Sequence, residues 1–236
     1  MTKLKAFDVL ITAQEAYPAL ERAVIGAKDR IDMGFRVFDP RTALLSRRAR
    51  EIGDTWVDLL VAKLDEGVRI SISLTDFDPV VRAEMHAGTW KALRVLQGIA
   101  EMSKNPNLMQ ARVYDHPARV GWAPRLVLWT KIMDQLRATC SWLGALDPNA
   151  RKDVLRSMPR LQGMVCENDD GSFAPVQANI PPMIPVTHHQ KVAVIDDRWL
   201  YIGGLDLDRR RLDTPEHKTA AAQTWHDVQA ILHDPD

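Results

Sequence analysis

The sequence predicts an α/β fold in which helices cover a central β-sheet. Helical and strand patterns alternate three times in the first half of the chain. Such alternation favours a sheet with helices on both faces. With 236 residues, 46% of them hydrophobic, the chain can bury a sizeable core without disulfides or a structural metal. We therefore treat residues 1–236 as a single lobe.

The first two helix and strand pairs follow the same order. Residues 15–24 carry apolar side chains at helical spacing, with Pro18 near the first turn. Residues 31–37 then alternate apolar and polar side chains, which is the pattern of a half-buried strand. Residues 56–64 and 68–74 repeat the helix and the strand.

The next segments complete a third pair and then become less regular. Residues 79–102 are predicted as a helix and residues 110–114 as a strand. Residues 122–143 are rich in Trp and Leu, a pattern that favours an amphipathic core helix over a lipid-facing flap. Residues 167–185 are rich in Asp, Asn, Gly and Pro and predict a long loop.

Composition limits the environment and the cofactors that we expect. Lys plus Arg and Asp plus Glu both total 31, so no net charge attracts nucleic acid or an anionic membrane. The charged start of the chain does not fit a signal peptide, and no apolar run approaches a membrane span. Cys140 and Cys166 lack the spacing of a metal or redox motif. We expect free thiols, no metal or other cofactor, and a cytoplasmic protein or one that contacts membranes peripherally.

Residues 186–206 carry the most informative pattern in the chain. Two short β-branched or aromatic runs, residues 192–195 and 199–202, flank a turn and predict a hairpin. His189 and Lys191 are two residues apart, so on an extended strand their side chains leave the same face. An imidazole beside an ammonium suits a phosphate: Lys191 holds oxygen charge, while His189 attacks phosphorus or moves a proton.

This segment resembles the first motif copy of the phospholipase D superfamily. His189, Lys191 and Asp196 reproduce the pattern H-x-K-x-x-x-x-D. The family pattern continues in register with Gly203, Gly204 and Asp206, although many members have Ser and Asn at the last two positions. Residues 211–215 and 224–229 resemble the continuation of the same copy. The resemblance is specific from residue 187 to about residue 235 and weak before it.

The resemblance implies a fold and a reaction. The fold is the phospholipase D/nuclease fold, an α-β-α sandwich with a mixed, largely parallel central sheet. In the implied reaction His189 forms a phosphohistidine, which water or an alcohol then resolves, and Lys191 stabilises the phosphoryl oxygens. Asp227 would hydrogen-bond the other imidazole nitrogen and orient the ring. No metal or cofactor is required in this scheme.

Other positions receive weaker assignments from the same resemblance. Asp196 belongs to the catalytic motif, although a carboxylate that supports the turn is the simpler role. Candidate contacts to the substrate are His188, Gly203, Gly204 and Asp206. Asp213 and His217 fit head-group ligands and surface caps equally well, and His226 fits structural packing.

The family's site needs two facing motifs, and this sequence contains one. None of the other histidines begins a second H-x-K-x-x-x-x-D. Either the chain is the first half of a longer enzyme, inactive by itself, or it pairs with an identical copy as small nucleases do. The G-G-L-D form, typical of first copies, favours the longer enzyme.

We expect a phosphodiesterase that hydrolyses or transfers the phosphatidyl group of glycerophospholipids. The charge balance and the form of the motif favour lipid over nucleic acid. The alternatives are a phosphatidyltransferase similar to cardiolipin synthase, a homodimeric nuclease, and a noncatalytic lobe that binds lipid or phosphate. The last is weakened because His189 and Lys191 are both present.

Overall fold

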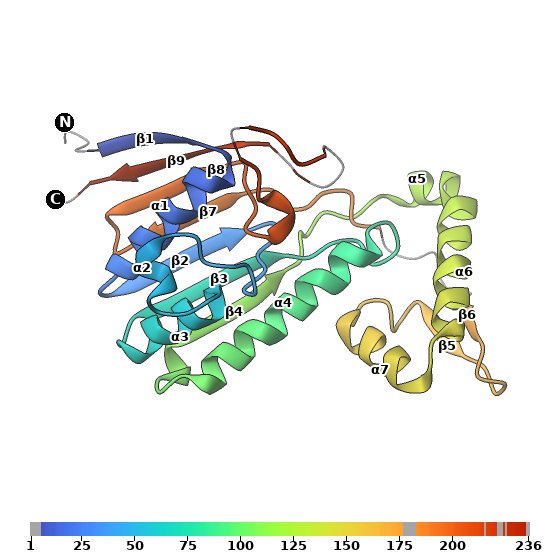
Figure 1. The fold of residues 1–236 in the computed structure, drawn as a ribbon. Coiled ribbons are helices and arrows are strands. Elements are labelled where there is room, and N and C mark those ends of the chain that lie inside the picture. The colour runs from blue at the N-terminus through green and yellow to red at the C-terminus, as the bar shows by residue number, and fades with distance from the viewer. Residues whose placement is uncertain (1–5, 177–182, 215, 221–223, 225, 235–236) are drawn as a thin grey trace. The chain divides into compact units, whose positions relative to one another are not determined.

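The computed structural model describes residues 6–176, 183–214, 216–220, 224 and 226–234 (Figure 1). The chain divides into two compact units. Unit 1 comprises residues 1–75, 92–114 and 188–236, and unit 2 comprises residues 76–91 and 115–187. The motif residues from His188 onward all belong to unit 1.

Unit 1 is built on a seven-stranded sheet with the order β1-β9-β8-β7-β2-β3-β4. Its strands are β1 (Ala6–Ile11), β2 (Arg30–Phe35), β3 (Arg69–Thr75), β4 (Met109–Tyr114), β7 (Lys191–Ile195), β8 (Trp199–Gly203) and β9 (Val228–His233). The predicted strands in residues 31–37, 68–74 and 110–114 and the predicted hairpin are confirmed, each with shifted ends. Strand β1 was not predicted.

The α/β class and the mixed sheet are confirmed, but the prediction of a largely parallel sheet is wrong. Only the β2–β3 and β3–β4 pairs are parallel. The other four pairs are antiparallel. The short turn after β7 explains part of this, because strands joined by a tight hairpin can pair only in opposite directions. Asp196 and Asp197 in this turn have φ values of 53° and 56°, as the twist of a two-residue hairpin turn requires.

Helices cover the sheet of unit 1 and bury its apolar core. The helices of the chain are α1 (Thr12–Gly26), α2 (Arg47–Arg50), α3 (Trp56–Asp65), α4 (Ala83–Met102), α5 (Trp122–Val127), α6 (Trp129–Ala145) and α7 (Pro148–Ser157), with 3-10 turns at Pro106–Leu108 and Arg209–Arg211. Residues of α1, α3 and the second half of α4 join one core cluster with alternate residues of β2, β3 and β7. The intervening strand residues, such as Asp32 and Val194, are only half-buried. Among the described residues of unit 1, the apolar core therefore lies on one face of the sheet.

Unit 2 has its own small core around α6. Ile132, Leu136 and Leu143 on α6 are buried in a cluster separate from that of unit 1. The prediction of an amphipathic core helix is therefore confirmed for α6, whereas Trp122 on α5 is 72% exposed. A short hairpin, β5 (Val165–Glu167) and β6 (Phe173–Pro175), occupies part of the predicted loop, and residues 177–182 of that loop lie outside the described residues.

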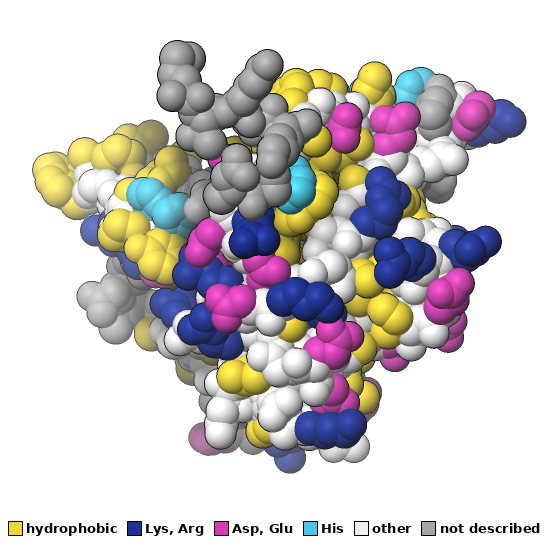
Figure 2. All heavy atoms as spheres, turned by 90° about the vertical axis from the view of Figure 1, so that its left-hand side faces the viewer, with side chains coloured by type: hydrophobic (Ala, Val, Ile, Leu, Met, Phe, Trp, Pro, Cys, Tyr) yellow, Lys and Arg dark blue, Asp and Glu magenta, His cyan; other side chains and the backbone are white. Residues whose placement is uncertain are grey.

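The cysteines, the helices and the surface charges of the described residues can be compared with what the composition predicts. Cys140 and Cys166 are both free, as expected. Within the described residues, every helix is too short or too polar to cross a membrane. On the face drawn in Figure 2, Lys and Arg side chains are interspersed with Asp and Glu side chains, in keeping with the balanced composition.

The close approach of β8 and β9 makes a prediction about Gly203. A Cβ at this position would lie 2.3 Å from Gln229 Oε1 and 2.4 Å from the Val228 carbonyl oxygen. Gly203→Ala should therefore destabilise the protein by about 1–3 kcal/mol, because backbone must move to admit the methyl group. Urea unfolding measures the change.

Gly98→Ala is the matched control in the same unit. Gly98 lies within α4, and a Cβ there would meet nothing within 4 Å. This substitution should stabilise the protein by about 0.5–1 kcal/mol through helix propensity. Equal free energies of unfolding for Gly203→Ala and wild type would contradict the role given to the glycine.

Candidate active site

The candidate site lies at one edge of the unit 1 sheet, where several strands end or begin. Lys191 starts β7 and is paired with Phe35 at the end of β2. β8 ends at Gly203, which is paired with Gln229 near the start of β9. This edge also holds the carboxyl ends of the parallel strands β2 and β3, where α/β sheets commonly bind ligands.

His189 and Lys191 lie side by side at this edge. Lys191 Nζ is 3.0 Å from Nδ1 and 3.4 Å from Nε2 of the His189 ring, and it also donates to the His189 carbonyl oxygen at 3.0 Å. Lys191 is 2% exposed, whereas the His189 side chain is exposed. An ammonium held inside the protein thus contacts an imidazole that solvent can reach.

The surroundings of the pair shift both pKa values downward. Burial lowers the pKa of His189 below 6.5, and the positive charges of Lys191 and Arg36 lower it further. Burial likewise lowers the pKa of Lys191, while the charge of Asp206 opposes that shift. At pH 7 the neutral form of His189 is therefore favoured, and in that form one ring nitrogen carries a lone pair free of a proton.

Asp206 is a buried carboxylate that accepts hydrogen bonds from two segments of the chain. Its Oδ2 accepts from Arg36 Nε at 3.0 Å and Nη2 at 2.8 Å, and from Arg211 Nη2 at 3.2 Å. Its Oδ1 accepts from the Val37 backbone N–H at 3.0 Å. Asp206 is fully buried, its charge acts on both His189 and Lys191, and it anchors two arginines near them.

Three residues at this edge were not assigned to the site from the sequence. Arg36 follows the last residue of β2, Arg211 lies in the 3-10 turn after β8, and Gln229 is the second residue of β9. The Gln229 side chain accepts from the Leu205 N–H at 3.1 Å and donates to the Lys191 carbonyl at 3.4 Å. Arg211 and Gln229 lie in segments that resemble the continuation of the motif, but their contacts were not predicted. Arg36 binds a residue 170 positions away, so no local pattern signalled it.

Asp227 lies over Gly204. A Cβ on Gly204 would be 2.0 Å from Asp227 Oδ1, so a glycine is required here to leave room for the carboxylate. Asp227 Oδ1 accepts from the Val228 N–H at 2.9 Å, and its negative charge opposes the lowering of the His189 pKa. In the described part of the chain no hydrogen bond joins Asp227 to His189, so its orienting role stays a prediction. Trp225 of the same motif lies outside the described residues.

Asp196 does not join the site. It follows the last residue of β7, a whole strand away from Lys191, and its carboxylate accepts backbone N–H groups of Lys28, Asp29 and Arg30 at 2.7–2.9 Å. A carboxylate in this place ties the β7–β8 turn to the chain entering β2. These contacts support the turn-supporting role of Asp196, and a part for it in catalysis stays a prediction, because the motif's spacing spans the full length of the strand.

His188 faces a different space from His189. It lines a cavity of about 230 Å³ with Gly34, Ser73, Tyr114 and Gln190, among other residues. Its ring packs edge-on against Tyr114, with centroids 4.7 Å apart, and its carbonyl accepts from Thr75 Oγ1 at 2.7 Å. Since neither His189 nor Lys191 lines this cavity, a contact between His188 and the substrate stays a prediction.

Comparisons with known proteins found similar chains among solved structures alone, all at low sequence identity. No family model matches the chain, and no curated protein matches it. Among solved structures, the chain is similar to NucT from Helicobacter pylori (11% identity, TM-score 0.44, covering 97% of this chain and 86% of that one). It is also similar to Nuc from Salmonella typhimurium, a phospholipase D family member (12%, 0.37, 97% and 83%). Phosphatidylserine synthase from Haemophilus influenzae is a third (11%, 0.43, 98% and 36%).

The structural role of Asp196 can be tested against its neighbour. Asp196→Ala removes an acceptor of three backbone N–H groups and should destabilise the protein by about 1–3 kcal/mol. Asp197→Ala is the control, since Asp197 shares the positive φ but forms only an exposed ion pair with Arg30. Its loss should be worth less than about 1 kcal/mol. Chemical unfolding of both variants decides between the two roles.

The same carboxylate makes stability depend on pH. Burial alone would raise the pKa of Asp196, but the hydrogen bonds from Arg30, Asp29 and Lys28 outweigh it and lower the pKa below 3.8. A lowered pKa in the folded state stabilises the protein above the unfolded value, and this contribution is lost as pH falls through the folded value. The gap in stability between wild type and Asp196→Ala should therefore narrow on acidification below pH 3.8.

The neutral imidazole can be observed directly. In an NMR titration, the His189 ring should titrate with a midpoint below 6.5. Lys191→Gln should move that midpoint upward, because one of the positive charges that oppose protonation is gone. Arg137→Gln in unit 2, which removes an exposed partner of Asp134, should leave it unchanged. A wild-type midpoint at or above 6.5 would exclude the proposed electrostatic effect.

Proposed function

We propose that the chain supplies one half of a phosphodiesterase site of the phospholipase D type, in which His189 is the nucleophile. The observation that carries this proposal is the 3.0 Å contact between the buried ammonium of Lys191 and the exposed imidazole of His189. Lys191 cannot swing far from the ring, because it starts a central strand and also bonds the His189 carbonyl. A phosphoryl group next to His189 would therefore meet a fixed positive charge.

The reaction divides into two displacements. The unprotonated nitrogen of His189 attacks phosphorus, and the bond between phosphorus and the leaving alcohol breaks, which gives a phosphohistidine. The leaving oxygen takes a proton from an acid. Water or a second alcohol then attacks the phosphohistidine, gives up its proton to the same group and restores the free imidazole. Lys191 stabilises the oxygens of both transition states.

We propose that the acid comes from a second motif of the same kind. This sequence contains one such motif, so the partner is a second lobe of a longer chain or a second copy. The open face of the sheet has room for a neighbour: Phe7, Val9, Ile11, Ile202 and Val228 are 44–58% exposed. Strand pairing places Val9 and Ile202 on the same face, since both are aligned with Ala230.

The proposed substrate is a glycerophospholipid, whose phosphatidyl group is hydrolysed or transferred. Support comes from the resemblance to first motif copies and from the balance of 31 basic and 31 acidic residues. A nuclease would need a basic surface for the phosphate backbone. The face drawn in Figure 2 has cations and anions interspersed instead.

His189→Asn should abolish turnover while the fold is retained. The assay uses the assembly that carries both motifs, either the longer enzyme or the dimer, with phosphatidylcholine vesicles and butanol, and it measures phosphatidylbutanol and released choline. We expect a loss of at least about a thousandfold, because the amide cannot form the covalent intermediate. Acid-labile phosphate on the wild-type protein, absent from the variant, identifies the intermediate.

One control tests the assigned nucleophile, and the other tests the proposed class of substrate. His116→Asn, a change in unit 2, should turn over like wild type. Single-stranded DNA is tested in parallel, and cleavage of DNA without lipid turnover would move the substrate class to nucleic acid. Turnover in His189→Asn equal to wild type would contradict the assigned nucleophile.

A further inference from the structure

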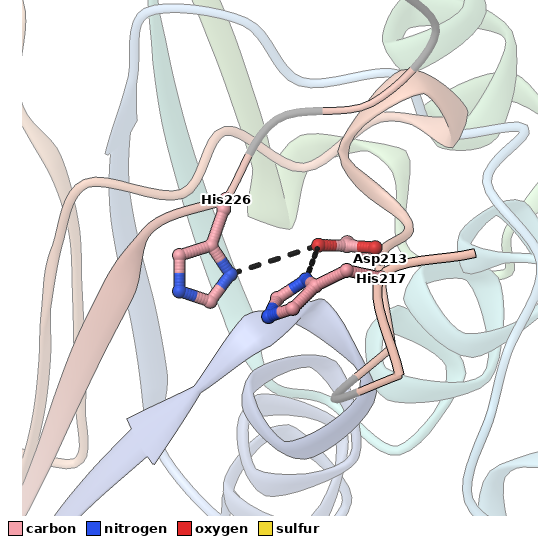
Figure 3. Close-up of side chains that lie close together, drawn as sticks. All are labelled: Asp213, His217 and His226. Carbon is pink, nitrogen blue, oxygen red and sulfur yellow. Dashed lines mark hydrogen bonds and ion pairs between the residues drawn. The ribbon is translucent and has the colours of Figure 1, made fainter. Parts of the chain in front are cut away.

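A second cluster of side chains lies in unit 1, and the proposed reaction does not use it. Asp213 follows the 3-10 turn at Arg209–Arg211, His217 comes four residues later, and His226 lies just before β9 (Figure 3). His217 Nδ1 is 2.7 Å from Asp213 Oδ2, and His226 Nδ1 is 3.6 Å from the same oxygen. The two imidazole rings meet edge to face with centroids 4.6 Å apart.

The carboxylate of this cluster is buried and only half satisfied. The Asp213 side chain is 2% exposed. Among the described residues its Oδ1 is buried without a hydrogen-bond partner. Oδ2 is the oxygen that faces both histidines (Figure 3). A buried carboxylate with one unpartnered oxygen is costly, and a cation bound at Oδ2 would offset its charge.

The donor set and its spacing suit a transition metal. One ligand atom from each of the three residues lies within 4.8 Å of the other two. Bonds of about 2.1 Å at tetrahedral angles put ligand atoms about 3.4 Å apart. Two of the observed separations, 2.7 and 3.6 Å, bracket that value, so small side-chain rotations suffice. Two imidazoles with one carboxylate are ligands that Zn²⁺ accepts readily, whereas Ca²⁺ and Mg²⁺ prefer oxygen.

We propose that Asp213, His217 and His226 form a binding site for a divalent transition metal, for which Zn²⁺ is the best fit. Asp213 supplies the buried ligand, and the two histidines close over the metal from the solvent side, since their side chains are 53% and 48% exposed. Three protein ligands leave a fourth position for water or an anion.

The metal would connect two segments that reach the candidate active site. Arg211, which binds Asp206, is two residues before Asp213. Asp227, which lies over Gly204, directly follows His226. A metal that joins Asp213 to His226 therefore fixes the segments carrying Arg211 and Asp227. We assign it this positioning role, and the chemistry at His189 involves no step through it.

The test uses the full chain, stripped with a chelator and then titrated with Co²⁺ and Zn²⁺. Co²⁺ bound by nitrogen and oxygen in a four-coordinate site gives a visible absorption band, which excess Zn²⁺ removes. We expect one equivalent per chain in wild type and at least a tenfold weaker binding in His217→Ala and in His226→Ala. At the same concentration, Zn²⁺ should also raise the unfolding temperature of wild type by more than that of either variant.

Matched controls keep the outcome clear. His116→Ala and His233→Ala each remove a histidine elsewhere and should bind the metal as wild type does. Because His217 and His226 are exposed, circular dichroism should show that their variants keep the fold. Absence of a Co²⁺ band in wild type, or equal affinity in wild type and His217→Ala, would overturn the proposal. These readouts do not depend on turnover, so they stand apart from the test of His189.

Discussion

The buried carboxylate of Asp206 is the constraint on which this edge of the sheet depends. It lies in the loop after β8, yet it binds Arg36 and the Val37 N–H after β2 and Arg211 in the 3-10 turn. Such an anion survives inside a protein only when it is paired and hydrogen-bonded. The backbone bridge between Phe38 and Leu207 fastens the same two segments. The end of β2 and the loop after β8 are therefore held together beside the start of β7.

This anchoring explains how two neighbouring residues acquire opposite environments. Lys191 starts β7, and its side chain lies on the core side of the sheet, where the charge of Asp206 favours its protonated form. His189 precedes the strand and extends into solvent. A buried cation can stay in place without water to screen it, and an exposed imidazole can meet a phosphodiester. The buried position of Lys191 and the exposed position of His189 depend on where β7 begins. A longer β7 would hold the backbone closer to His189 in the sheet and limit how its side chain can move.

Local patterns predicted the elements that have a clear period. Hydrophobic spacing gave α1, α3 and α6 and the alternating strands β2 and β3. The hairpin of β7 and β8 was predicted as well, because β-branched residues flank a turn. Strand β1 was missed, since Phe7, Val9 and Ile11 pair only with the distant strand β9. Its side chains are mostly exposed, so burial left no alternating signature.

The contact between His189 and Lys191 was predicted, whereas the contacts that hold them in place were missed. The two-residue spacing of His189 and Lys191 sufficed to place them together. The anchoring of Arg36 by Asp206 joins residues 170 positions apart, and no periodicity encodes such a contact. The spacing of Asp196 to Lys191 resembled a motif, but distance along a strand separated them. The cluster of Asp213, His217 and His226 likewise forms only when the loop after β8 folds back to β9.

The pairing of β1 with β9 has a consequence for synthesis of the chain on the ribosome. β1, the first described strand, has as its sheet partner the last described strand, with Ala6 opposite His233. Strand β7, which lies between β2 and β8, is also made late. An N-terminal segment with exposed apolar side chains must therefore wait, unpaired, until nearly all of the described chain has been translated. Such a delay leaves an apolar strand edge unpaired, which is a surface prone to aggregation during folding.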